Sequence, residues 1–420
     1  MIKKPFFGLK KPELKYSMET LPFEDIPTPR EATVFLKNPN GKLREELFKV
    51  GDEVKTGQKL MFSSDSPEYI ISPVTGKISS IFSYTDAFGT PYYGIKIESN
   101  GSDDWDDQFA GEATLETAID FLEFAPGKYS FRKLSDTPDK IDTIIINGMD
   151  IDLGITVNQE IVKTNSSKIK EGIDSLKKIT GASNFILVVP ETLSKEAGSA
   201  GATVKTIPAT FPNALPAMII KDVLDKVTPA GKKPEDIGIA VISAENTVAI
   251  AEAFATGKIP VIKALSVVGK DGKVTNVKAR IGTPISDILA KCNIVLEEND
   301  RIILGGAMLG TATYSKDLPI EPNTDAITVQ SESESAQVSD YPCISCGECV
   351  RICPMKIQVN LLCRLAEFGF YEDAESYDLY SCIECGLCAY VCTAKRPLLQ
   401  YIKLAKHELE LIKLSEAINE

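Results

Sequence analysis

The chain has 420 residues, a formal net charge of −13 and a hydrophobic content of 43%. This length predicts several domains with sizeable cores, and the acidic balance without a basic block excludes nucleic acid as an expected partner. No apolar run approaches the length of a membrane-spanning helix, and we expect no signal peptide, so the ten cysteines indicate a reducing compartment.

Residues 30–100 are predicted to form short strands separated by turns. Residues 50–58 (VGDEVKTGQ) and 72–78 (SPVTGKI) are two similar half-motifs, each with a glycine-containing turn beside a brief strand. The pair resembles the barrel-sandwich hybrid of lipoyl and biotinyl carriers, which attach their cofactor to a lysine in the hairpin between the halves. Residues 63–69 occupy that position and contain no lysine, so we expect a structural or docking module without a swinging arm.

Residues 101–257 are predicted to form a Rossmann-like α/β domain. After a polar stretch at 101–140, apolar strands alternate with amphipathic helices, which is typical of a parallel sheet covered by helices. The expected strands are 142–146, 185–189 and 237–242, and the expected helices are 159–179, 214–227 and 245–255, the last closed by Gly257.

Residues 258–330 are predicted to form a β-grasp domain. Its first feature is a hairpin signature around the turn Lys270-Asp271-Gly272. The expected elements are strands 261–268 and 274–281, a helix at 284–291 and a strand at 301–304.

Two cysteine runs are the most informative feature of the chain. The first reads Cys343-x2-Cys346-x2-Cys349-x3-Cys353, and the second reads Cys382-x2-Cys385-x2-Cys388-x3-Cys392. This is the spacing of bacterial ferredoxins with two [4Fe–4S] clusters, in which three thiolates hold one cluster and the fourth ligates the other. We therefore assign Cys343, Cys346, Cys349 and Cys392 to the first cluster, and Cys382, Cys385, Cys388 and Cys353 to the second.

An α-helical two-cluster ferredoxin domain is thus predicted at 341–400, between a flexible linker at 331–340 (SESESAQVSD) and a C-terminal packing helix at 401–420. Disulfides and zinc are the alternatives. Disulfides suit small secreted proteins, and zinc sites often include histidine, whereas His407 lies outside both runs. Cys292 and Cys363 also lie outside them and are expected to be small buried hydrophobic residues.

In this order the domains resemble the C subunit of the Rnf ion-translocating ferredoxin oxidoreductase complex, over most of the chain. The most specific matching pieces are 50–58, 282–285 (GTPI), 305–310 (GGAMLG) and the two cysteine runs. The first three domains are also similar to the A subunit of the sodium-pumping NADH:quinone reductase, which lacks the ferredoxin domain. The resemblance implies a β-grasp of the soluble-ligand-binding type, as in the flavin subunit of respiratory complex I.

The Rnf resemblance also implies FMN, which accepts a hydride from NADH and passes single electrons to the clusters. Three loops depart from the family's flavin pattern. Where the family has a glycine-rich segment, this chain has residues 122–131, in which only Gly127 remains. Residues 149–154 stand in place of the family's ECEP-type segment, and residues 211–216 stand in place of its tyrosine-proline-glycine patch. We therefore predict that the FMN site is lost and that a cytochrome or other redox protein donates electrons. A drifted pocket that still binds flavin is the alternative.

Three functions fit these features. The first is an electron-transfer subunit, peripheral on the cytoplasmic face of the cell membrane, with no catalytic residue assigned. Its partners would be membrane-embedded and iron–sulfur subunits of the same complex and a soluble redox donor or acceptor protein. The alternatives are an NADH dehydrogenase subunit with FMN and a quinone-binding subunit, whose apolar pocket has no short signature. Asp150 and Asp152 are candidate functional carboxylates, or else helix caps or solvent-facing residues.

Overall fold

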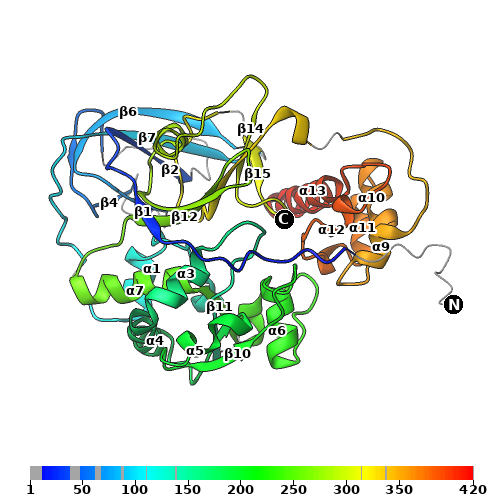
Figure 1. Ribbon diagram of the computed structural model, residues 1–420, viewed down its shortest axis with the longest axis horizontal. Coiled ribbons are helices and arrows are strands. Elements are labelled where there is room, and N and C mark those ends of the chain that lie inside the picture. The colour runs from blue at the N-terminus through cyan, green and yellow to red at the C-terminus, as the bar shows by residue number, and fades with distance from the viewer. Residues whose placement is uncertain are drawn as a thin grey trace. The chain divides into compact units, whose positions relative to one another are not determined.

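The computed structural model describes residues 12–37, 48–61, 68–86, 89–109, 111–137, 140–313, 315–335 and 338–419. The chain divides into two compact units. The larger comprises Tyr16–Ala209 and Pro234–Ser333, and the smaller comprises Met1–Lys15, Thr210–Lys233 and Glu334–Glu420. In Figure 1 the last of these segments, in orange and red, is built from helices.

A parallel four-stranded sheet lies in the larger unit, with the strand order β10-β9-β8-β11. Its strands are β8 (Thr143–Asn147), β9 (Asn184–Val189), β10 (Thr203–Thr206) and β11 (Ile239–Ser243). Every residue of β8 is buried, which explains its continuous apolar sequence, since parallel strands are usually covered on both faces. Three of these strands lie close to the predicted positions.

The helices of this region are α1 (Leu115–Phe121), α2 (Arg132–Ser135), α3 (Val157–Thr164), α4 (Ser166–Thr180), α5 (Ser194–Ala197) and α7 (Ala244–Thr256), with short 3-10 turns η1 (Glu191–Leu193) and η2 (Pro234–Ile237). The single helix predicted at 159–179 is wrong, because Asn165 leaves the helical conformation with a φ of −126°. The side chain of Thr164 donates to that of Asn165, a local bond that competes with the helical backbone. Helices α1 and α2 lie within residues 101–140, which were predicted only as a polar stretch.

A six-stranded mixed sheet follows, with the order β1-β13-β12-β16-β14-β15. The predicted hairpin is confirmed, since β12 and β13 pair antiparallel. The strands are β1 (Phe23–Asp25), β12 (Ile262–Val268), β13 (Val274–Arg280), β14 (Arg301–Leu304), β15 (Thr311–Thr313) and β16 (Ala326–Gln330). Helix α8 (Ile285–Lys291) contributes its buried face to the core of this sheet. The parallel pairing of β1 with β13 was not foreseen.

The N-terminal region contains a four-stranded antiparallel sheet and a separate two-stranded pair. The elements are β2 (Glu31–Lys37), β3 (Glu53–Val54), β6 (Gly76–Thr85) and β7 (Pro91–Ser99), with β4 (Lys59–Leu60) paired to β5 (Ile70–Ile71). Side chains from both sheets, including Val34, Leu60 and Ile95, form one core. The hairpin predicted at 63–69 lies mostly outside the described residues.

The smaller unit is helical. Its elements are α6 (Pro216–Leu224), α9 (Glu348–Ile352), α10 (Val359–Glu367), α11 (Tyr371–Ser376), η4 (Leu379–Ser381), α12 (Leu387–Tyr390) and α13 (Leu398–Asn419). Helix α6 is shorter than predicted, because Pro216 fixes its first turn and Asp225 ends it with a left-handed φ of 52°. Helices α10 and α13 share a core around Leu362, Cys363 and Ile402.

A short 3-10 turn, η3 (Glu332–Glu334), begins the segment that was predicted as a linker. Within the described part of the chain, no helix combines the length and the apolar character needed to cross a membrane.

Candidate iron–sulfur site and buried charged network

The two cysteine runs fold into turns with the same backbone. Gly347 and Gly386 each have a φ of 75° and begin the short helices α9 and α12. Ser345 and Glu384 each have a φ of 56°, and each backbone amide donates to the cysteine sulfur two residues earlier, at 3.4 Å. Amide hydrogen bonds to sulfur are one of the means by which proteins tune iron–sulfur clusters.

The eight cysteines of the two runs line two cavities. The first is lined by Cys343, Cys346, Cys349 and Cys392 and by Cys363 from outside the runs, with Ile344 and Leu398 among the apolar neighbours. The second is lined by Cys382, Cys385, Cys388 and Cys353, with Met355, Val359 and Leu399. The fourth cysteine of each run therefore lies with the first three of the other run.

The chemistry of these cavities fits iron–sulfur clusters. Within the described residues, no group of three metal-binding side chains surrounds a single-ion site. A [4Fe–4S] cluster has a different requirement, because its thiolates bind separate irons and so surround a volume. Burial raises the pKa of Cys349 and that of Cys385 to about 11, so these thiols stay neutral until a bound metal displaces their protons.

The two cysteines outside the runs have different surroundings. Cys363 on α10 is buried, as expected, and its thiol donates to the carbonyl oxygen of Leu398 at 3.2 Å, but it also lines the first cavity. Cys292 ends α8 and is only partly buried.

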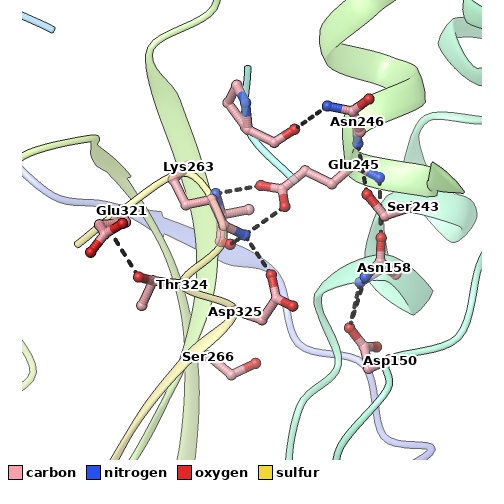
Figure 2. Close-up of polar contacts among 12 residues, drawn as sticks. Asp150, Asn158, Ser243, Glu245, Asn246, Lys263, Ser266, Glu321, Thr324 and Asp325 are labelled. Atoms are coloured by element: carbon pink, nitrogen blue, oxygen red, sulfur yellow. Dashed lines mark hydrogen bonds and ion pairs between the residues drawn. The ribbon is translucent and has the colours of Figure 1, made fainter. Parts of the chain in front are cut away.

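A network of buried charged and polar side chains connects α3, α7 and β12 in the larger unit (Figure 2). Lys263 is fully buried, and Figure 2 shows the carboxylates of Glu245 and Asp325 pointing toward its ammonium group. The nitrogen lies 2.5 Å from Glu245, 3.0 Å from Asp325 and 2.7 Å from the carbonyl oxygen of Ala264. These three partners satisfy all three donors of the ammonium group.

The charges of this network are unequal, since two carboxylates face one ammonium. Burial and the nearby Asp325 raise the pKa of Glu245 and Lys263 lowers it, and the net result is a pKa of about 7. Attraction to the two carboxylates raises the pKa of Lys263 against the opposing effect of burial. The lysine therefore stays charged, and Glu245 is the group that takes up a proton most readily near neutral pH.

Asp150 and Asp152 are both buried, so the solvent-facing alternative is wrong for both. Asp150 caps the start of α3, because its carboxylate accepts the backbone amide and the side-chain amide of Asn158. Burial raises the pKa of Asp150 to about 6. Asp152 accepts the backbone amides of Met308 and Leu309 and so anchors the glycine-rich 305–310 loop.

The loop that corresponds to the family's flavin segment packs tightly against the start of α7. Gly127 has a φ of 76°, and a Cβ atom there would lie 2.5 Å from Ser243 Oγ and 2.8 Å from the amide nitrogen of Asn246. The Asn246 side chain donates to the carbonyl oxygen of Pro126. Its own Oδ1 atom and the Oε1 atom of Gln159 are buried and have no hydrogen-bond partner among the described residues.

Sequence reasoning missed the Lys263 network, although a signal was present. Lys263 interrupts the apolar run Val261-Ile262-Lys263-Ala264-Leu265, and a lysine inside a buried strand requires an anionic partner. The partners themselves, Glu245 and Asp325, lie 18 and 62 residues away in the sequence.

Three family models match the chain. Residues 6–102 match the RnfC barrel sandwich hybrid domain, residues 127–252 match the Nuo51 FMN-binding domain, and residues 335–393 match a 4Fe-4S dicluster domain. Together these matches define a multidomain class of protein that combines a barrel-sandwich hybrid, an FMN-binding domain and a 4Fe-4S ferredoxin domain, and the predicted barrel-sandwich hybrid is confirmed.

Comparison with three relatives identifies the family within this class of protein. The C subunit of the proton-translocating ferredoxin:NAD(+) oxidoreductase complex of Clostridium ljungdahlii is 30% identical over 92% of this chain and 90% of that protein. The C subunit of the Na(+)-translocating ferredoxin:NAD(+) oxidoreductase complex of Acetobacterium woodii is 26% identical over 96% of each. In Klebsiella pneumoniae the C subunit of the ion-translocating oxidoreductase complex is 26% identical, and this chain spans 57% of it. The chain belongs to the RnfC family, which confirms the resemblance inferred from its motifs.

The prediction that the FMN site is lost is wrong. That prediction was based on the sequences of three short loops, whereas the match to the FMN-binding domain extends over residues 127–252. Two features of the structure fit a flavin at this place. The close approach of Gly127 to α7 leaves the loop no room for a side chain, and the unpaired oxygens of Asn246 and Gln159 can accept hydrogen bonds from a ligand.

Proposed function

We propose that this chain is the peripheral electron-transfer subunit of an Rnf-type ion-translocating complex and carries FMN and two [4Fe–4S] clusters. The observation that carries the proposal is the arrangement of the eight cysteines of the two runs around two cavities, four of them at each, with Cys363 as a further cysteine at the first. The relatives' membership in ferredoxin:NAD(+) oxidoreductase complexes supports it. Its partners would be membrane-embedded and iron–sulfur subunits, with the chain on the cytoplasmic face of the membrane.

The proposed ligands are Cys343, Cys346, Cys349 and Cys392 for the first cluster, and Cys382, Cys385, Cys388 and Cys353 for the second. The apolar side chains that line the cavities would exclude water, and the amides of Ser345 and Glu384 would stabilise charge on the ligand sulfurs. When bound, FMN supplies the exchange between two-electron and one-electron transfer.

Gly127, Asn246 and Gln159 are the residues proposed to lie against the flavin. Gly127 would keep the loop close to α7, and the two side-chain amides would orient the ligand through their free oxygens. The four-stranded parallel sheet with its helices supports a Rossmann-like assignment, in which ligands bind beyond the carboxyl ends of the strands. The six-stranded sheet with α8 supports a β-grasp assignment.

The proposed electron donor is a cytochrome or another redox protein, because the carboxylates of the acidic segment 149–154, which follows β8, already form hydrogen bonds within the chain. Asp150 caps α3 and Asp152 holds the 305–310 loop, so neither carboxylate is free for a nicotinamide ligand. The match to the FMN-binding domain supports bound flavin and does not identify the donor, so an NADH dehydrogenase subunit remains the alternative.

Anaerobic purification tests the composition. We expect about eight iron and eight sulfide atoms and one FMN per chain, with an EPR signal after reduction by dithionite. A colourless, EPR-silent sample after reconstitution would contradict the cluster assignment, and intact clusters without flavin would contradict the FMN assignment. Addition of NADH distinguishes the donors, because bleaching of the flavin by NADH supports the alternative and its absence supports a protein donor.

Replacing Gly127 with Ala is expected to lower FMN content severalfold while the iron content stays unchanged. The new Cβ atom collides with Ser243 and Asn246 and displaces the loop. Gly272→Ala is a matched control, because Gly272 has a similar φ of 74° but open space around its Cβ position. Flavin fluorescence after acid release measures the effect. Equal FMN content in both variants would contradict the role given to this loop.

A further inference from the structure

The two cysteine turns are structural repeats, so differences between them indicate different roles. Ser345 of the first turn corresponds to Glu384 of the second, and the two residues share the same φ and the same amide-to-sulfur bond. Their exposure differs. Cys343, Ile344 and Ser345 are exposed, whereas the corresponding residues 382–384 are only partly exposed, and Cys385 is buried.

The second turn is attached to helix α13 by Lys406. The ammonium group of Lys406 donates to the carbonyl oxygen of Cys382 at 2.9 Å and to the carboxylate of Glu384 at 2.7 Å. The Lys406 side chain is 20% exposed, so water screens this contact less than at an open surface. Among the described residues, none makes the equivalent pair of bonds to the first turn.

We propose that Lys406 is a positioning residue for the second cluster, which it holds in place and keeps at a higher reduction potential than its ligands alone would give. The proposal deepens the proposed function and rests on the cluster assignment made there. It makes the two clusters non-equivalent, with one ligand turn open to solvent and the other fixed to the C-terminal helix.

Two physical effects follow from this contact. First, the bonds from Lys406 fix the carbonyl group of Cys382 and the side chain of Glu384. They thereby hold the backbone of the turn that carries three of the thiolates of the second cluster. Second, a cation beside a ligand stabilises the more negative, reduced form of the cluster and so raises its potential. Glu384 offsets part of the charge, so removing Lys406 leaves an unpaired carboxylate that lowers the potential further.

Lys406→Met in the full-length chain tests the proposal. The midpoint potential of each cluster is followed by EPR during a redox titration, in a Cys346→Ser background that retains the second cluster and a Cys385→Ser background that retains the first. Lys413→Met is the matched control, because Lys413 is seven residues further along α13 and forms a similar 2.7 Å ion pair with Glu375, which is not in a ligand turn. Lys406→Arg keeps the charge.

We expect Lys406→Met to lower the potential of the second cluster, or to lose that cluster's iron, while the first cluster and the Lys413→Met chain behave as wild type. Lys406→Arg should recover most of the loss, and Glu384→Gln should shift the potential upward. An unchanged second-cluster potential with full iron content in Lys406→Met would overturn the proposal, as would an equal shift in Lys413→Met. Failure of the cluster assignment itself is separate, since it shows as missing iron in the unmodified chain.

Discussion

Replacing Cys346 with Ser is expected to remove about half of the iron from the anaerobically purified chain, because each cluster has its own four thiolate ligands. Cys346 lines the first cavity with Cys343, Cys349 and Cys392, and no residue of that set lines the second. Iron and sulfide analysis measures the loss. The remaining EPR signal should be that of a single cluster without coupling to a neighbour.

The same variant should leave the larger unit folded, and the one tryptophan reports on this. Trp105 packs against the core of that unit, so its fluorescence in urea should match that of the unmodified chain. Cys292→Ser is the control, because Cys292 lies outside both runs and ends α8. Full iron content in the Cys346→Ser chain, or equal loss in the Cys292→Ser chain, would overturn the ligand assignment.

Replacing Lys263 with Met is expected to lower the free energy of unfolding of the larger unit by about 3–5 kcal/mol, the usual cost of removing one partner from a buried ion pair. Met fills a similar volume, so the loss comes from charge. Glu245 is left buried without a cation, and Asp325 loses the partner that lies 3.0 Å away. Urea unfolding followed by Trp105 fluorescence measures the change.

The size of this effect should depend on pH. The folded-state pKa of Glu245 is raised from 4.5 to about 7, so the folded chain binds this proton more tightly than the unfolded chain. The contribution of Glu245 to stability is therefore fully present below about pH 4.5 and is lost as pH rises toward 7. In Lys263→Met the carboxyl group is protonated even more readily, so the deficit should be larger at about pH 8 than at about pH 5.

Two further variants separate charge from packing. Adding Glu245→Gln to Lys263→Met should recover part of the stability, because it removes one of the two uncompensated charges. Lys55→Met should have a much smaller effect, since the side chains of Lys55 and its partner Asp104 are 53% and 59% exposed and water screens their pair. A Lys263→Met chain as stable as wild type at both pH values would contradict the role assigned to the network.

Local sequence features predicted the parts of the molecule that depend on near neighbours. The turn Lys270-Asp271-Gly272 predicted the β12–β13 hairpin, because a tight turn fixes the pairing of the strands beside it. The cysteine spacing predicted that the fourth thiol of each run serves the other cluster, and the cavity linings agree with this arrangement, but the ligand assignment itself stays a prediction. Motifs at 50–58 and 305–310 were specific enough to indicate the family before any comparison.

Motif reading failed where it judged a site by a few loop residues. The loss of glycines around Gly127 and the replacement of the acidic segment at 149–154 suggested a lost flavin site, but the domain framework over 127–252 still matches an FMN-binding domain. Asp150 and Asp152 looked interchangeable in the sequence. In the fold one caps α3 and the other anchors a loop more than 150 residues away.

The sequence by itself predicted the family and the elements with strong periodicity, because motifs and periodicity depend on residues a few positions apart. The cysteine ligands and the domain bounds stay predictions. Tertiary structure decided the rest. The pairing of β1 with β13, the burial of Lys263 between Glu245 and Asp325, and the contact of Lys406 with the second cysteine turn join residues that are distant in the chain. Such contacts depend on packing and on the cost of leaving a buried charge unpaired. A local sequence pattern does not indicate which distant residue will pair with that charge.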